Sequence, residues 1–276
     1  MSLITRVVNF YIFSSLHVAF ASTSLVLMTL HMFKLSADWP MVSFVFFGTV
    51  VGYNFVKYDA LTRTSTLVGN SRLKLYAVLS FFCFLFAGWS FLHLRWQTQA
   101  IGIVFLALTL LYTLPFFPNR RNARNWAGVK IYIVALCWVG VTLALPVINA
   151  DIAITTDFFV KCLQRFIFVF VLILIFEIID ISTDDPHLKT VPQQIGINAT
   201  KWLGVFLITI FYFLEFLKTD FESIQLIINA VIVVLMMGFL AFANESRPKY
   251  YSLFWAEMLP IVWLMLLYGA ELFVGY

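Results

Sequence analysis

Long apolar runs dominate this sequence and restrict it to a helical, membrane-embedded fold. Nine runs of spanning length follow one another along the chain, separated by short polar breaks. A helix needs about 20 largely apolar residues to cross the hydrocarbon core of a bilayer. Because backbone groups in lipid have no water to bind, they must be hydrogen-bonded within the segment, as they are in a helix. The runs lie near 7–33, 41–58, 73–94, 99–117, 127–148, 155–181, 201–218, 224–243 and 251–274.

The composition excludes a soluble fold of this length. Hydrophobic residues make up 62% of the 276 positions, charged residues make up 12%, and the mean hydropathy is +0.93. Soluble domains carry about 25% charged residues, so this chain has too few charges to cover a water-facing surface. We therefore predict an all-α, polytopic membrane protein of about nine transmembrane helices, forming one domain over residues 1–276. We expect membrane lipid around it and no nucleic-acid partner.

The basic residues indicate the orientation of the chain in the membrane. If successive runs cross in alternate directions, thirteen of the 18 Lys and Arg residues fall on one side. The cytoplasmic side of a membrane protein carries such an excess. We therefore expect a multi-pass protein of the cell membrane with its N-terminus in the cytoplasm and its C-terminus outside. The five on the other side are Lys34, Arg95, Lys161, Arg165 and Lys218.

An acidic cluster at the end of the sixth run is the strongest chemical signal. Glu177, Asp180 and Asp184 are spaced i, i+3 and i+7, which places them on one face of a continuing helix. Carboxylates are costly near a membrane boundary and at a helix C-terminus, so they need a positive partner. Mg²⁺, which takes one or two carboxylates and phosphate oxygens, would serve, and so would Lys or Arg. Lys189 follows closely enough to meet a phosphate. The alternative is a solvated acidic loop.

The residues around this cluster form a pattern. It reads D-x-x-x-D and, after a short gap, K-T-x-P-x-x-x-G, formed by Asp180, Asp184, Lys189, Thr190, Pro192 and Gly196. This pattern resembles the second acidic motif of the UbiA superfamily of intramembrane prenyltransferases. The segments LYTLPF at 111–116 and PNRR at 118–121 are similar to that family's Tyr-Pro-rich helix end and basic loop. Nine helices is also the family's number.

The resemblance implies a fold, a reaction and roles for residues. The fold is a ring of helices around a central cavity that opens sideways to lipid. The reaction moves a polyprenyl group from its diphosphate to an apolar acceptor, with Mg²⁺ as the cofactor. The resemblance implies that Asp180 and Asp184 bind Mg²⁺ with help from Asn54, and that Lys189 and Lys57 contact the diphosphate. The remaining substrate-binding candidates are Tyr112, Arg120 and Lys130.

The first acidic motif of that family, N-D-x-x-D-x-x-x-D, is degenerate in this chain. The corresponding segment at 54–62 reads NFVKYDALT, so Asn54 matches and Phe55, Tyr58 and Thr62 replace the three Asp residues. Asp59 is one residue out of register, a rotation of about 100° on a helix. Three interpretations remain open: a site with one Mg²⁺, a site in which Lys57 neutralises the diphosphate directly, and a protein that binds a prenyl lipid or a partner without turnover.

Structural roles remain open for several candidates. Asn54 and His17 are alternatively side chains that join neighbouring helices by hydrogen bonds, and Arg120 is alternatively a topogenic charge. Glu257 either lines the cavity or pairs with a basic residue such as Lys249. A secondary transporter is the least favoured function, because the acidic residues lie at one membrane face and not at the midplane. The acceptor, the prenyl chain length and the oligomeric state are not decided by the sequence.

Overall fold

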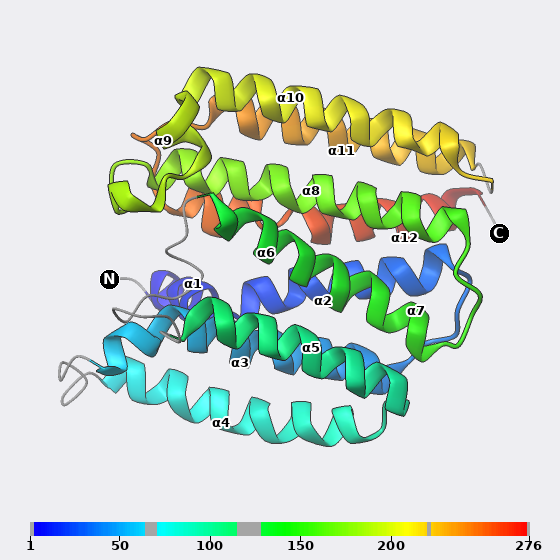
Figure 1. Cartoon of the computed structure of the whole chain (residues 1–276), viewed down its shortest axis with the longest axis horizontal. Coiled ribbons are helices and arrows are strands. Elements are labelled where there is room, and N and C mark those ends of the chain that lie inside the picture. The colour runs from blue at the N-terminus through cyan, green and yellow to red at the C-terminus, as the bar shows by residue number, and fades with distance from the viewer. Residues whose placement is uncertain (1–2, 64–70, 115–127, 220–221, 275–276) are drawn as a thin grey trace.

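The chain forms a bundle of long helices that lie side by side (Figure 1). The computed structural model describes residues 3–63, 71–114, 128–219 and 222–274, and all regular structure in these ranges is helical. The α-helices are α1 Leu3–Phe13, α2 Leu16–Met32, α3 Trp39–Arg63, α4 Ser71–Leu92, α5 Trp96–Thr113, α6 Val129–Val139, α7 Leu145–Asn149, α8 Thr156–Asp180, α9 Val191–Ile195, α10 Ile197–Phe213, α11 Ser223–Phe242 and α12 Leu259–Val274. The wider π-helical turns are η4 Gly140–Ala144 and η7 Tyr251–Ala256, and the tighter 3₁₀ turns are η5 Pro186–Leu188 and η6 Leu214–Leu217.

The prediction of a multi-pass helical membrane protein is confirmed, but the number nine is not. Within the described ranges, seven helical segments are long and apolar enough to cross a membrane. They become eight if α1 and α2, which are bent by 56° at their junction, cross as one segment. The apolar part of α5, Trp96–Leu111, is shorter. The count differs because the first predicted run is broken, and because the fourth, 99–117, is only partly within the described residues.

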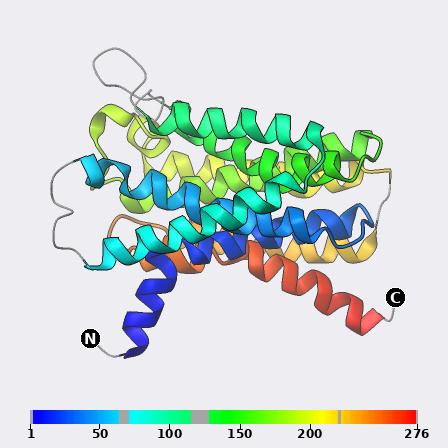
Figure 2. The same cartoon turned by 90° about the horizontal axis from the view of Figure 1, so that it is seen from below.

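The break in the first run occurs at two serines. Ser15 has a left-handed backbone with φ 64°, and its hydroxyl donates to Asn54 Oδ1 at 2.8 Å. Serine side chains compete with the backbone for hydrogen bonds and so favour helix ends. The short helix α1 consequently projects from the side of the bundle (Figure 2). Ser14 and Ser15 are buried at the junction, and α1 lies at the end of the bundle that also carries α9 (Figure 1).

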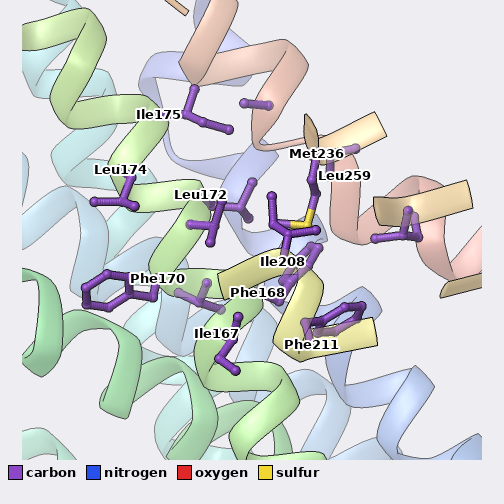
Figure 3. Close-up of a cluster of buried hydrophobic side chains, with 14 of the residues drawn as sticks. Ile167, Phe168, Phe170, Leu172, Leu174, Ile175, Ile208, Phe211, Met236 and Leu259 are labelled. Carbon is purple, nitrogen blue, oxygen red and sulfur yellow. The ribbon is translucent and has the colours of Figure 1, made fainter. Parts of the chain in front are cut away.

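Helix α8 is the centre of the main apolar core. Within its spanning window 72% of the residues are buried, against at most 50% in the other spanning segments. Phe168 packs against Trp263 with ring centroids 5.0 Å apart, and Phe211 lies 5.6 Å from the same indole. Figure 3 shows Phe168 and Phe211 with Ile175, Ile208 and other members of the cluster. This packing holds the end of α8, where the acidic residues lie, against α10, α11 and α12.

A proline explains the wide turn η4. Pro146 has no backbone N–H, so the carbonyl of Thr142 four residues earlier lacks its helical partner. The hydroxyl of Thr29 in α2 donates to that carbonyl at 2.8 Å, and it also donates to Leu25 O. Buried Arg165 of α8 donates to Leu25 O and to Thr142 Oγ1. Polar groups that the proline sets free therefore join α2, η4 and α8 inside the bundle, as membrane helices require.

Candidate active site

The two aspartates of the predicted motif lie on one turn. Helix α8 ends at Asp180, but the N–H of Asp184 still donates to the carbonyl of Asp180 at 2.8 Å. The hydroxyl and the N–H of Thr183 donate to the same carbonyl. Because this i to i+4 bond extends the helical path by one turn, the Asp180 and Asp184 side chains are close enough to interact electrostatically.

Glu177, the third acidic residue of the cluster, supports the loop that follows. Its side chain is buried, and its Oε2 accepts a hydrogen bond of 3.0 Å from the N–H of Val191. Val191 is the first residue of α9, whose N-terminus also has a capping box formed by Thr190 and Gln193. Helix N-termini favour negative charge because their N–H groups lack partners. Glu177 therefore fixes α9 against the end of α8.

Two lysines face the aspartates from distant parts of the chain. Lys130 Nζ, from the first turn of α6, lies 3.9 Å from Asp184 Oδ2. Lys249 Nζ, just before η7, lies 3.6 Å from Asp180 Oδ1. Lys130 also interacts electrostatically with Glu177. Each aspartate of the cluster therefore has a lysine nearby. Carboxylates can bind a metal ion and lysines can bind an anion, so the arrangement suits the two together.

The donor set fits Mg²⁺. Asp184 Oδ2 is buried and has no hydrogen-bond partner within the described structure, and an unsatisfied buried carboxylate oxygen is costly. Two carboxylates leave the other positions of an octahedral Mg²⁺ for water and phosphate oxygens. No group of three or more His, Cys, Asp or Glu side chains suited to a metal occurs among the described residues.

Lys189 lies in the loop of the cluster but does not join its ion pairs. Its backbone is left-handed with φ 44°, and its carbonyl accepts a hydrogen bond from Gln194 Nε2. Its side chain is exposed, and none of the described carboxylates lies within ion-pair distance of its ammonium group. The structure thus places Lys189 beside the site, with its side chain in solvent.

Asn54 and Lys57 belong to a second polar cluster. Asn54 is buried, accepts the Ser15 hydroxyl and donates to Ser80 Oγ at 2.9 Å. Lys57 Nζ donates to Ser15 Oγ at 3.1 Å and lies 5.9 Å from the centre of the Tyr53 ring. Neither side chain makes a described contact with Asp180 or Asp184. The structure therefore does not bring these two candidates to the acidic cluster.

The side chains at two of the replaced positions make other contacts. The Tyr58 hydroxyl donates to Phe13 O at 2.7 Å, and its ring stacks on Tyr76 with centroids 5.5 Å apart. Phe55 is exposed on the surface of the bundle. The side chains of Asp59, Thr62 and Tyr112 lie outside the described residues, and so does Arg120 altogether.

Sequence reasoning missed the contact between Lys249 and Asp180. Lys249 was considered a partner for Glu257, which lies on the same segment. The structure instead pairs Lys249 with Asp180 and leaves Glu257 facing Lys57. The available signal was the predicted topology, because it placed Lys249 and Asp180 on one side of the membrane. That signal does not choose among the many basic residues of that side.

Two solved structures share this architecture. One is the apo structure of a UbiA homolog from Aeropyrum pernix K1, which is 14% identical, covers 96% of this chain and 97% of its own, and has a TM-score of 0.62. The chain has the UbiA fold. The other comes from a study of digeranylgeranylglyceryl phosphate synthase, with 12% identity, 95% and 97% coverage, and a TM-score of 0.58. No protein-family model and no curated protein matches the sequence.

Proposed function

We propose that this UbiA-fold protein is a prenyltransferase that moves a polyprenyl group from its diphosphate to an apolar aromatic or lipid acceptor. The observation that carries the proposal is the turn that presents Asp180 and Asp184 together. In it, Asp184 Oδ2 has no hydrogen-bond partner and is the atom nearest to the Lys130 ammonium group. The similarity to structures of UbiA homologues supports it through the fold alone.

The chain's own residues would hold and neutralise the diphosphate. Asp180 and Asp184 would bind Mg²⁺, which would supply positive charge beside the leaving diphosphate. In this proposal Lys130 and Lys249, which lie near the two aspartates, would donate charge-assisted hydrogen bonds to phosphate oxygens. Lys189 would turn in from the loop to join them. Positive groups fixed where negative charge develops stabilise the transition state of such a transfer.

The orientation in the membrane belongs to this proposal. The acidic cluster lies at the end of the bundle that carries α1 and α9, the end that the excess of basic residues assigns to the cytoplasm (Figure 1). A water-soluble diphosphate head would therefore enter from the cytoplasm, while its prenyl tail stays among apolar side chains.

A second candidate function is binding of a prenyl lipid without turnover. The observation that favours it is the use of Tyr58 in packing against Phe13 and Tyr76, at a position where the resemblance calls for an Asp. The same fold would then bind a prenyl lipid, and the missing aspartates of the first acidic motif would explain why no transfer follows.

Titration with geranylgeranyl diphosphate separates these functions. A ligand that binds the native state raises the unfolding midpoint. For the transferase we expect a rise that requires Mg²⁺, disappears in Asp180→Ala/Asp184→Ala, and is accompanied by release of inorganic diphosphate when an acceptor lipid is added. A rise without release in the presence of a range of phenolic and glycerolipid acceptors would favour the binding protein. No rise, or a rise unaffected by Mg²⁺ and by the mutations, would contradict the transferase.

A further inference from the structure

A second charged centre lies in the bundle, apart from the ion pairs of the acidic cluster, and is built around Lys57. Its ammonium group donates to Ser15 Oγ, the Ser15 hydroxyl donates to Asn54 Oδ1, and Asn54 Nδ2 donates to Ser80 Oγ. This directed chain fixes the ammonium near the break between α1 and α2. An ammonium group has three N–H donors, so two remain for a ligand after the bond to Ser15.

Glu257 lies on a segment held near this lysine, because Ser15, which accepts from Lys57, and His17, which bonds Phe254 O, are two residues apart at the start of α2. The N–H of Glu257 donates to Ser252 O, which closes the π-helical turn η7 just before α12. The carboxylate interacts electrostatically with Lys57 and with Tyr11, yet no described basic side chain lies within 4 Å of it. Charged groups inside membrane segments are costly and are usually kept for function. A π-helical turn is also a frequent feature of functional sites.

His17 positions the segment that carries Glu257. Its Nε2 lies 2.9 Å from Phe254 O, and because a carbonyl only accepts, Nε2 must carry the hydrogen. In the neutral ring Nδ1 then accepts from the Tyr11 hydroxyl, 3.0 Å away. Both ring nitrogens are therefore occupied, and the imidazole stacks on the Phe254 ring. Among these groups Glu257 is the one available to take a proton from a ligand.

One segment connects this centre to the acidic cluster. Lys249 at its start contacts Asp180, and Glu257 follows eight residues later (257 − 249). At the helical rise per residue this separates the two along the chain by about 12 Å. The turn η7 between them packs against α8. A donor at Asp180 and an acceptor at Glu257 would therefore bind at two positions along one segment.

We propose that Lys57 and Glu257 bind the acceptor, that the acceptor presents an ionisable hydroxyl group, and that Glu257 is the base of the transfer. In the step, which rests on the proposed prenyltransferase function, the bond between the allylic carbon and the diphosphate oxygen breaks, and its electron pair leaves with the diphosphate. A bond forms between that carbon and the acceptor oxygen. The hydroxyl proton passes to the Glu257 carboxylate, and the Lys57 ammonium stabilises the oxygen as it loses the proton. The product is an ether.

Binding of a matched pair of lipids tests the hydroxyl requirement. Dodecylphenol carries an ionisable hydroxyl, and dodecylanisole is the same molecule with that hydroxyl methylated. In the full-length protein in detergent, tryptophan fluorescence should give a Kd at least about 10-fold lower for the phenol, the loss expected when a buried polar partner goes unpaired. We expect Glu257→Gln and Lys57→Met to remove this preference, and the control Glu245→Gln, on an exposed loop, to keep it.

The transfer itself tests the role as a base. With geranylgeranyl diphosphate, Mg²⁺ and dodecylphenol, Glu257→Gln should lower kcat by about 100-fold, a usual effect of losing a general base, with the KM of the diphosphate unchanged. Equal binding of phenol and anisole by the unmodified protein would overturn the inference, as would a Glu257→Gln variant with full kcat. If the phenol preference is present and depends on Glu257 while no Mg²⁺-dependent diphosphate binding occurs, the proposed function fails and the hydroxyl site stands.

Discussion

Lys130 Nζ lies 3.9 Å from Asp184 Oδ2, and this contact joins the first turn of α6 to the turn that follows α8. The separation is longer than a hydrogen bond, so the two charges attract one another without completing each other's bonds. Asp184 Oδ2 remains unsatisfied as a result. The site therefore contains an unsatisfied carboxylate oxygen, and the first two predictions test whether a ligand binds there.

Neutralising Asp184 should separate stability from ligand binding. Without ligand, Asp184→Asn should unfold close to the temperature of the unmodified protein, because it removes both the repulsion from Asp180 and the attraction of Lys130. With geranylgeranyl diphosphate and Mg²⁺ the mutant should lose the rise in midpoint. Asp185→Asn is the matched control, because Asp185 is the next residue in the chain but its side chain is exposed. Its carboxylate accepts a hydrogen bond from the His187 N–H, which lowers its pKa, so it is charged in the unmodified protein. Loss of the ligand effect in both variants would contradict a specific role of Asp184.

Removing the charge of Lys130 should weaken diphosphate binding. Lys130→Met keeps the length of the side chain and removes one charge-assisted contact, so we expect the Kd to rise about 10-fold, equivalent to about 1.4 kcal/mol. Titration calorimetry in the presence of Mg²⁺ measures it. Lys201→Met is the control, because the Lys201 ammonium binds Ala241 O away from the cluster. An unchanged Kd for Lys130→Met would remove Lys130 from the site.

The buried ion pair between Lys218 and Glu215, at the opposite end of the bundle, should contribute strongly to the free energy of unfolding. Lys218 Nζ lies 2.6 and 2.8 Å from the two oxygens of Glu215, and the side chains are 3% and 1% exposed. Gln164 and Asn229 also donate to this carboxylate. Lys218→Met leaves the Glu215 charge buried and should cost about 3–5 kcal/mol.

The double variant Glu215→Gln/Lys218→Met removes both charges of that pair and is the control. It should recover most of the loss when unfolding is followed in detergent with increasing denaturant. Equal destabilisation of the single and double variants would show that packing, and not the unpaired charge, causes the loss.

Gly140 provides the space for the Phe105 ring. A Cβ at this position would lie 1.9 Å from Phe105 Cζ, so the ring, or the helix that carries it, would have to move. We expect Gly140→Ala to lower the free energy of unfolding by about 1–3 kcal/mol and Gly140→Ala/Phe105→Leu to recover part of it. Gly88 in α4 is the control, because a Cβ there meets nothing within 4 Å. Gly88→Ala should instead stabilise by up to about 1 kcal/mol.

The predicted orientation can be tested with single cysteines. Ser36, in the loop between α2 and α3, and Ser182, in the turn after α8, are both exposed and lie at opposite ends of the bundle. In a background with Cys83, Cys137 and Cys162 replaced by Ala, a membrane-impermeant maleimide should label Ser36→Cys on intact cells. It should label Ser182→Cys only after permeabilisation. The reverse pattern would place the acidic cluster outside the cytoplasm.

The positions of the helices and of the acidic turn were predictable because both depend on local rules. Each apolar run became helical, since a chain in lipid must satisfy its own backbone groups. The i, i+4 spacing of Asp180 and Asp184 was sufficient to place them together, because the helical path continues through that turn. The break at Ser15 was not predicted, since serine is also common inside membrane helices and only its contact with Asn54 distinguishes this one.

By itself, the sequence determined the membrane environment, the helical segments and the acidic turn, because apolar periodicity and short-range spacing act within a few residues. Only the tertiary structure decided which lysine faces which aspartate. It placed Lys130 beside Asp184, Lys249 beside Asp180, and Lys57 opposite Glu257. The two members of each pair come from segments far apart in the chain. From the sequence, any lysine on one side of the membrane could pair with any carboxylate there, and only the packing of the helices around α8 decides which pairs form.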